Sequence, residues 1–161
     1  MKKYELTEET VTVYGKTLYR IRAVRDFGSV KTGEFGGYIE KEENLSHFGN
    51  AWISGDAWVY GDARVSGDAW VYGNAWVYGN AEVFNTRHFF VQGPIGSRDG
   101  YVTFYRTKDD TIGVRCGCFS GSLQKFVDRV EETHGGSRYE KEYKIAAELA
   151  KVCIRLEGES R

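Results

Sequence analysis

The sequence has almost no net charge and no long apolar segment. Its 22 basic and 23 acidic side chains give a formal charge of −1 over 161 residues, and residues 35–84, with two basic and seven acidic side chains, are distinctly acidic. A nucleic acid polymer is attracted by a positive surface, so we expect no DNA or RNA partner. No apolar run approaches the roughly 20 residues of a membrane-spanning helix, so we expect no membrane partner either.

Cysteine is also scarce. The chain has three cysteines, an odd number, and its first residues, MKKYELTEE, contain no apolar signal segment. Small secreted proteins usually pair their cysteines in disulfides and are made with such a signal. The sequence therefore predicts a reducing, cytoplasmic environment.

What the sequence has in abundance is one six-residue repeat. Residues 49–84 read GNAWIS, GDAWVY, GDARVS, GDAWVY, GNAWVY and GNAEVF without a break. Such a short unit cannot bury its apolar side alone, so it stacks on its neighbours. The spacing resembles the hexapeptide rule of left-handed parallel β-helices, in which three repeats make one triangular coil. A branched residue occupies the same place in each repeat, at Ile53, Val59, Val65, Val71, Val77 and Val83.

The predicted fold class is mainly β, a short left-handed parallel β-helix with a cap. Residues 1–34 contain TVTVYGKTLYRIRAV, which alternates on both sides of a turn at Gly15, so we expect a β-hairpin cap there. An open β-helix end would leave strand edges unpaired, which is why a cap is expected. The β-helix itself is expected over residues 35–84, with two earlier rungs at Ile39 and Leu45 and a two-residue bulge before the perfect repeats.

The repeat ends at residue 84, and residues 85–161 are predicted to form a small α+β domain. RHFFVQ, YVTFYRT and TIGVRC have the composition of strands. SGSLQKFVDRVEETHGG predicts a helix with a serine N-cap and a glycine stop. A second helix is expected from about Arg138 to Leu156.

Aromatic side chains are concentrated on the outside of the predicted β-helix. All four tryptophans lie in the repeats, and the neighbours of an inward-pointing residue point outward. An aromatic patch of this size exceeds what soluble monomers usually expose, so we expect a homo-oligomer interface; packing on the C-terminal domain and stacking on a planar ligand are the alternatives. Hexapeptide β-helices commonly form trimers, so the resemblance implies a trimer or a multiple of it. The predicted interface residues are Tyr38, Trp52, Trp58, Tyr60, Trp70, Trp76 and Tyr78.

Each repeat opens with glycine followed by asparagine or aspartate, which is turn chemistry. The alternative is a calcium ladder along the corners. Corner residues one coil apart, such as Asn50 and Asp68, always combine one charged and one neutral side chain. The stacks need no cation to offset repulsion, so we expect structural corners.

The C-terminal segment carries the candidate anion-binding residues. GPIGSR is a compact loop whose backbone amides, serine and arginine could converge on an anion; a simple turn stabilised by Pro94 is the alternative. Arg115 and Arg138 would complete a phosphate-binding cluster if the loops converge, and tryptophan rings could stack on a base. The predicted ligand-binding residues are Ser97, Arg98, Arg115, Trp58 and Trp76.

Zinc binding and catalysis are further alternatives. CGCF follows a strand and precedes a predicted helix start, which would lower a thiol pKa. Cys116, Cys118 and His134 could bind zinc, but their spacing matches no common zinc pattern, so no metal and no cofactor are predicted. Enzymes with this β-helix are commonly acyltransferases that use a histidine as general base. His47, in the predicted bulge, would be that base in a coenzyme A-dependent reaction.

Two segments together, GGYIEKEENLSHFGNAWISGDAWVYGDARV and GPIGSR…VRCGCFSGSLQKF, resemble a group of small bacteriophage and prophage proteins. These combine a GGWIE-like start, hexapeptide repeats and a C-terminal domain with a GSR…CGCF pattern; here Tyr38 stands in place of tryptophan. They carry fold-level labels such as polymer-forming protein, and no catalytic residue can be carried over. The phage context implies an oligomer in the host cytoplasm that sequesters a nucleotide-derived immune signal. A scaffold that presents the C-terminal domain to a host protein is the alternative, and an acyltransferase is the other.

Overall fold

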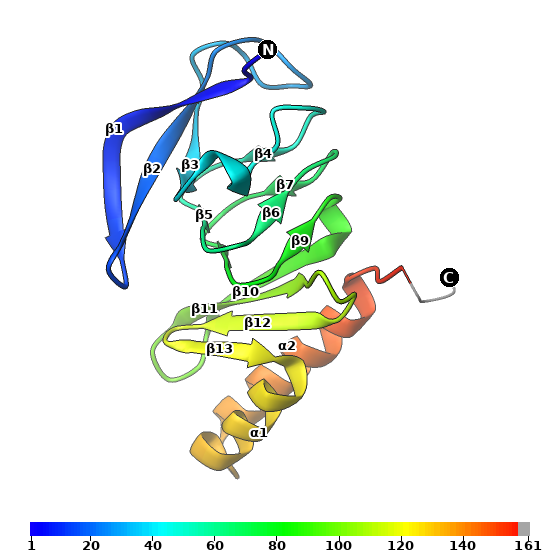
Figure 1. Ribbon diagram of the computed structural model, residues 1–161. Coiled ribbons are helices and arrows are strands. Elements are labelled where there is room, and N and C mark those ends of the chain that lie inside the picture. The colour runs from blue at the N-terminus through cyan, green and yellow to red at the C-terminus, as the bar shows by residue number, and fades with distance from the viewer. Residues whose placement is uncertain (158–161) are drawn as a thin grey trace. The chain divides into compact units, whose positions relative to one another are not determined.

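The structure, a computed structural model, describes residues 1–157 and divides into two compact units, residues 1–86 and residues 87 onward. The first unit contains the N-terminal hairpin and the repeats, and the second contains a sheet and two helices (Figure 1). The chain is mixed α/β, with 40% strand and 22% helix, so its helical share is larger than a mainly β class implies. Its described strands form four small sheets, none of them closed.

The predicted N-terminal hairpin is confirmed. β1 (Tyr4–Val13) pairs antiparallel with β2 (Lys16–Ala23). The turn between them has positive φ at both Tyr14 and Gly15 (47° and 78°), as two-residue hairpin turns require. β2 also pairs antiparallel with β3 (Phe35–Ile39), so the hairpin and the first coil of the repeats share one sheet.

The repeats form two-residue strands that pair in parallel with strands three repeats away. β5 (Trp58–Val59) pairs with β8 (Trp76–Val77), and on its other side β5 pairs with β3. Two further stacks join β4 (Trp52–Ile53) with β7 (Trp70–Val71) and β6 (Arg64–Val65) with β9 (Glu82–Val83). The predicted inward positions are confirmed, because every one is buried: Ile39, Leu45, Ile53, Val59, Val65, Val71, Val77 and Val83.

The corners between these strands depend on glycine. All six glycines that open the repeats have positive φ, between 62° and 71°, a region that costs other residues energy. At Gly67 a side chain is excluded by space as well, since a Cβ there would lie 2.4 Å from the carbonyl oxygen of Phe84 in the next coil. The glycine part of the predicted Gly-Asx turns is therefore confirmed.

The backbone hydrogen bonds at the ends of the paired strands run from an earlier N–H to a carbonyl oxygen of the next coil, which creates a need for a cap. The N–H of Trp52 donates to the oxygen of Ala69 (3.0 Å) in the next coil, and Trp58 and Arg64 donate in the same sense. Carbonyl oxygens of the first coil therefore have no earlier coil to accept from. Buried carbonyls need a donor, and the N-terminal segment supplies donors to them.

Three side chains of that segment make the cap. The Lys3 ammonium donates to the oxygen of Ala51 (2.6 Å), and the Tyr4 hydroxyl donates to the oxygen of Leu45 (2.6 Å). Arg20 Nε donates to the oxygen of Gly36 (3.1 Å). Lys3 is wholly buried and also lies 4.7 Å from the centre of a phenylalanine ring. The hairpin region thus closes the open end by hydrogen bonding as well as by covering it.

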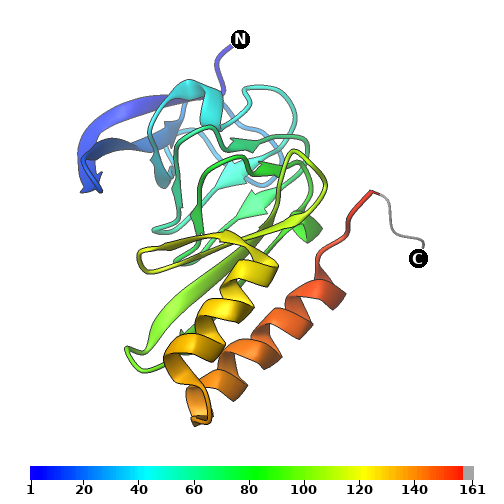
Figure 2. The same cartoon turned by 60° about the horizontal axis from the view of Figure 1, so that its bottom comes forward.

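The C-terminal unit is an antiparallel sheet with two helices on one face (Figure 2). Its strands follow one another in space as in sequence: β10 (Phe89–Ile95), β11 (Gly100–Arg106), β12 (Ile112–Cys116) and β13 (Phe119–Ser122). The helices are α1 (Leu123–His134) and α2 (Arg138–Cys153), and short 3₁₀ turns span Glu42–Asn44 and Thr86–His88. Apolar side chains from the sheet, among them Phe104 and Val114, pack against Phe126 of α1 and Ala147 of α2.

The C-terminal unit contains one strand that was not predicted, and its second helix ends earlier than expected. The serine N-cap of α1 is confirmed, since the Ser122 side chain accepts from the N–H of Lys125. β13 was not predicted, because the segment FSGS contains the residues that lead into the N-cap of α1. α2 ends at Cys153, three residues before the expected Leu156. No helix within residues 1–157 is both long and apolar enough to cross a membrane.

Candidate functional site

The topology of the C-terminal sheet brings two loops to the same edge. β10 and β12 run in the same direction, because each is antiparallel to β11. The turns that follow them, residues 96–99 and residues 117–118, therefore lie at one end of the sheet. The first turn holds the exposed Ser97 and Arg98, and the second holds the exposed Cys118. We call this region the turn end.

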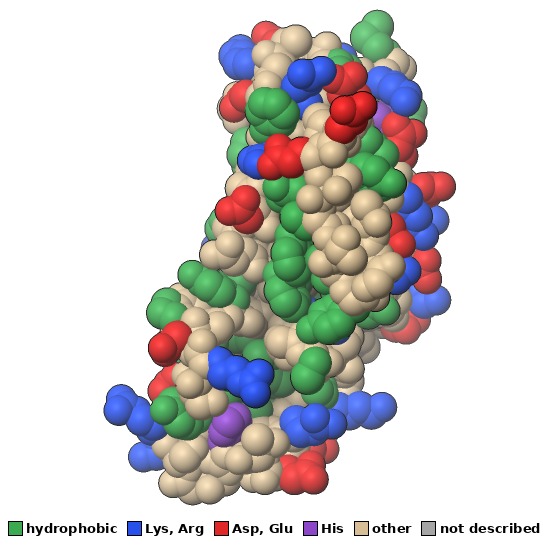
Figure 3. Space-filling view, turned by 90° about the vertical axis from the view of Figure 1, so that its left-hand side faces the viewer, with side chains coloured by type: hydrophobic (Ala, Val, Ile, Leu, Met, Phe, Trp, Pro, Cys, Tyr) green, Lys and Arg blue, Asp and Glu red, His purple; other side chains and the backbone are tan. Residues whose placement is uncertain are grey.

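The two helices bring further polar groups to the turn end. α1 finishes at His134, and α2 starts at Arg138. The carboxylate of Glu142 accepts a hydrogen bond from the N–H of Gly96 (3.0 Å), and its other oxygen is 3.8 Å from Arg138 Nε. One carboxylate thus joins the first turn to the start of α2. In the view of Figure 3, Lys and Arg side chains lie beside a histidine near the bottom of the picture.

Tyr143 of α2 lies at the centre of the turn end and was missed by sequence analysis. Its ring stacks on His134, with 5.6 Å between ring centres, and its hydroxyl interacts with the thiol of Cys116. A Cβ on Gly96 would lie 1.9 Å from the Tyr143 hydroxyl, so only glycine fits beneath this ring. The only signal in the sequence is the spacing of Tyr139 and Tyr143, one helical turn apart.

Burial determines the titration of both Tyr143 and Cys116. Burial, together with the neighbouring Cys116, raises the pKa of Tyr143 to about 12. Burial also raises the pKa of the Cys116 thiol. The expectation that a helix start lowers this thiol's pKa is therefore wrong, because β13 separates Cys116 from α1 and the thiol faces the core.

Arg115 does not join the other arginines. Its neighbours Val114 and Cys116 pack with the helices, and successive side chains of a strand point to opposite faces. The Arg115 side chain therefore lies on the face away from the helices, where the residue is only 6% exposed. The predicted cluster of three arginines is reduced to Arg98 and Arg138.

The cysteine and histidine candidates for a metal site lie at the turn end but are not grouped around a common point. Cys116 faces the core, Cys118 is exposed, and the ring of His134 stacks on tyrosine. Among residues 1–157, no three side chains of the metal-ligating types are placed to hold one ion. All three cysteines, including Cys153, are free thiols.

A groove runs beside the second turn, along α1. It has a volume of about 400 Å³, and its charged lining is balanced: Lys125 and Arg129 are accompanied by Asp128 and Glu132. The guanidinium of Arg129 lies over the ring of Phe119, 5.8 Å from its centre, and so already has an aromatic partner. The charges of the groove therefore cancel and give it no net attraction for an anion.

The aromatic side chains predicted to form the interface are partly covered by the hairpin of their own unit. Tyr38 and Tyr60 pack with Val13 and Leu18 of the hairpin, and Tyr60 is only 2% exposed. Trp52 is equally buried and meets the ring of Phe27 edge-on, 5.2 Å between centres. Three of the seven predicted interface residues are therefore buried inside the first unit, where the hairpin packs on Tyr38 and Tyr60 and Phe27 packs on Trp52.

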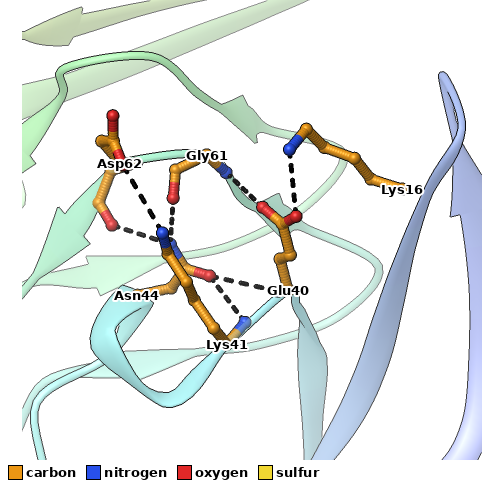
Figure 4. A network of polar contacts seen from close by, with 7 residues as sticks. Lys16, Glu40, Lys41, Asn44, Gly61 and Asp62 are labelled. Carbon is orange, nitrogen blue, oxygen red and sulfur yellow. Dashed lines mark hydrogen bonds and ion pairs between the residues drawn. The ribbon is translucent and has the colours of Figure 1, made fainter.

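A polar network holds the hairpin over this face (Figure 4). Lys16, at the start of β2, pairs with Glu40 (3.0 Å), whose other oxygen accepts from the N–H of Gly61 (2.9 Å). The buried side chain of Asn44 donates to the oxygens of Gly61 and Ala63 and accepts from the N–H groups of residues 40 and 41. All four hydrogen-bonding positions of this amide are filled, which ties the hairpin and first coil to the second coil.

The remaining aromatic residues stay partly exposed. Trp58 and Trp76 stack with 4.6 Å between ring centres and 16° between planes. The ring of Tyr78 lies against that of Tyr60, also with 4.6 Å between ring centres. Trp70 is half-buried as well. Figure 3 shows hydrophobic side chains gathered in a strip on the upper part of this side. We call the stacked pair Trp58 and Trp76 the tryptophan ladder.

His47, the candidate catalytic base, is packed into the cap. Its ring stacks on Tyr4 with 4.1 Å between centres, and its Nδ1 accepts from the N–H of Lys3 (3.1 Å). The other nitrogen, Nε2, is buried and lies 3.7 Å from Glu42. Burial lowers the pKa of His47. A general base must reach its substrate, so this placement favours a structural role.

Comparison with known proteins adds no relative to this description: no protein-family model matches the chain, and no curated protein matches it.

Proposed function

We propose that this chain is a homo-oligomeric binding protein of bacteriophage type, which captures a small nucleotide-derived anion and withholds it from a host defence. The observation that carries the proposal is the turn end, where the exposed Arg98 follows Gly96 in the turn bonded to the Glu142 carboxylate, and the exposed Arg138 lies beside the other oxygen of that carboxylate. Guanidinium groups bind phosphate through paired hydrogen bonds. Sequestration requires affinity alone and no turnover of the ligand.

The proposed fold of residues 35–84 is a short left-handed parallel β-helix. Three parallel stacks join strands three repeats apart, and a branched residue points inward in every repeat. Glycine with positive φ marks each corner. These features support the hexapeptide resemblance stated from the sequence. A rigid prism of this kind holds its outward side chains in fixed columns.

The proposed assembly uses the part of the aromatic face that the hairpin leaves open. The tryptophan ladder and Tyr78 are half-buried within one chain, and burying such rings between subunits removes apolar area from water. A trimer or a multiple of it is the expected assembly. If the ladder also stacks on a base, Trp58→Ala weakens both assembly and binding.

The proposal is tested by calorimetric titration of the full chain with 3′,3′-cyclic GMP–AMP, AMP and inorganic phosphate. A charged hydrogen bond contributes about 1.5–3 kcal/mol, so Arg98→Ala with Arg138→Ala is expected to weaken nucleotide binding at least tenfold. Arg64→Ala, which removes an exposed arginine from the repeats, is the matched control. Native mass spectrometry should show the same assembly for all three proteins.

Unchanged affinity in the double arginine variant would overturn the assignment of the turn end. Absence of binding to every compound, with empty oligomers recovered from cells that make nucleotide signals, would favour the scaffold alternative. In that alternative the repeats display copies of the C-terminal unit, and the arginine substitutions change nothing.

A further inference from the structure

The outer face of α2 carries an apolar stripe that no residue within 1–157 covers. Ile145, Leu149 and Val152 are 68%, 44% and 69% exposed. Their spacing of four and then three residues places them on one line along the helix. The opposite face of α2 packs Ala146, Ala147 and Ala150 into the core of the unit. α2 is therefore apolar on two faces, and among the described residues only one of these faces is packed.

Exposed aliphatic residues in a row differ from the single exposed hydrophobics of an ordinary surface. Isolated apolar side chains need no explanation, whereas a contiguous apolar stripe marks a contact surface. The stripe contains no aromatic residue, and its flank carries both signs of charge: Lys141, Glu148 and Lys151. A helix that lies on a membrane has a polar face rich in Lys and Arg. The mixed flank favours a protein partner.

The charges along this flank match a second copy of the same helix. Glu148 and Lys151 form an ion pair within the helix, at 2.9 Å. If two α2 helices cross antiparallel about a two-fold axis near Leu149, the same flank of each helix meets its counterpart. Glu148 of each copy then comes beside Lys151 of the other, and Ile145 comes opposite Val152. An isologous contact needs this kind of self-complementary surface.

We propose that α2 pairs with α2 of a second copy, antiparallel, through Ile145, Leu149 and Val152. This inference extends the proposed homo-oligomer, because it adds a two-fold contact to the contact made by the tryptophan ladder. It does not depend on the ligand. If contacts between tryptophan ladders form trimers, the α2 contact joins two trimers into a hexamer. If the tryptophan ladders make no contact between subunits, the α2 contact alone forms dimers.

The first test is the native mass of the full chain with Ile145→Glu and Val152→Glu. Both positions face solvent in one chain, so the fold is retained, as far-UV circular dichroism will show. The expected result is an oligomer of half the wild-type mass. Val24→Glu, a similar change at an exposed apolar residue of the first unit, is the control and should leave the mass unchanged.

The second test is covalent. In a Cys118→Ser background, Leu149→Cys should form a disulfide-linked dimer on mild oxidation, because the two-fold axis brings the two thiols together, while Val24→Cys should not. An unchanged mass in the double glutamate variant, or the absence of the Leu149→Cys dimer, would overturn the α2 contact. A host protein bound in place of the second copy would also overturn it. Neither result affects the titration of the turn end, so the two proposals fail separately.

Discussion

The two units of this chain are stabilised by different kinds of contact. The first has an interior of small side chains repeated in each coil, such as Ala57 and Val59, and a ladder of backbone hydrogen bonds between coils. The second has one core in which Phe104 and Phe126 meet edge to face, 5.9 Å between centres. A stack of repeats spreads its stability over equivalent neighbours, and its first repeat must be capped. The stability of a single core depends instead on its largest side chains.

The sequence provides separate probes for the two units. All four tryptophans lie in the first unit, and both α-helices lie in the second. Tryptophan fluorescence during urea unfolding therefore follows the first unit, and circular dichroism of the helices follows the second. Each prediction below states which of these two transitions moves.

The largest effect is expected from Phe126→Ala in the core of the second unit. Removing a buried phenylalanine leaves a cavity and costs about 3–5 kcal/mol. The helix transition should move to much lower urea while the fluorescence transition stays in place. Phe48→Ala, at a phenylalanine that is almost fully exposed, should move neither. Equal shifts of both transitions would show that the units unfold as one and would end the comparison.

The next effect compares two corners within the first unit. Gly67→Ala should cost roughly 3 kcal/mol, since an unfavourable φ is combined with a clash against the Phe84 carbonyl. Gly73 has a similar φ but open space around it, so Gly73→Ala should cost about 1 kcal/mol. Fluorescence midpoints measure both. If the two variants cost the same, backbone conformation alone governs the corners, and the close approach of neighbouring coils contributes nothing.

Raising the pH from 7 to 9.5 should shift the two units in opposite directions. Burial and the nearby Arg25 lower the pKa of Lys3 to about 8 in the folded chain. The unfolded chain therefore binds more protons above pH 8, and the first unit should gain about 2 kcal/mol of stability by pH 9.5. Burial raises the pKa of Cys116, so the unfolded thiol loses its proton first and the second unit becomes less stable.

Substitutions identify the two groups responsible for this divergence. Lys3→Met should abolish the gain in the fluorescence midpoint, and Cys116→Ser should abolish the loss in the helix midpoint. The raised pKa of Tyr4 opposes the gain only above about pH 10, where free tyrosine titrates. A wild-type fluorescence midpoint that falls between pH 7 and 9.5 would contradict the role assigned to Lys3.

The sequence predicts structure well where a local pattern repeats. The branched residue of each hexapeptide identified a buried position in every repeat, and the alternation around Gly15 identified the hairpin. It predicts poorly where distant segments meet. The Tyr4 hydroxyl bonds a carbonyl 41 residues away, and no spacing signals such a pair. Likewise, the meeting of Ser97, Arg98 and His134 at one end follows from strand direction, which the unpredicted β13 helps to set.

The smallest effect tests the cap that supplies hydrogen-bond donors to the carbonyl oxygens of the first coil. Tyr4→Phe removes one buried hydroxyl and leaves the carbonyl of Leu45 without this donor, at a cost of about 1–2 kcal/mol. The ring remains stacked on His47, so packing is retained and the change isolates the hydrogen bond. The fluorescence midpoint should fall and the helix midpoint should not. Tyr14→Phe, at the exposed hairpin turn, is the control. If Tyr4→Phe and Tyr14→Phe are equally stable, the end of the ladder is closed by coverage alone, and the buried carbonyls of the first coil do not require the donors assigned to them.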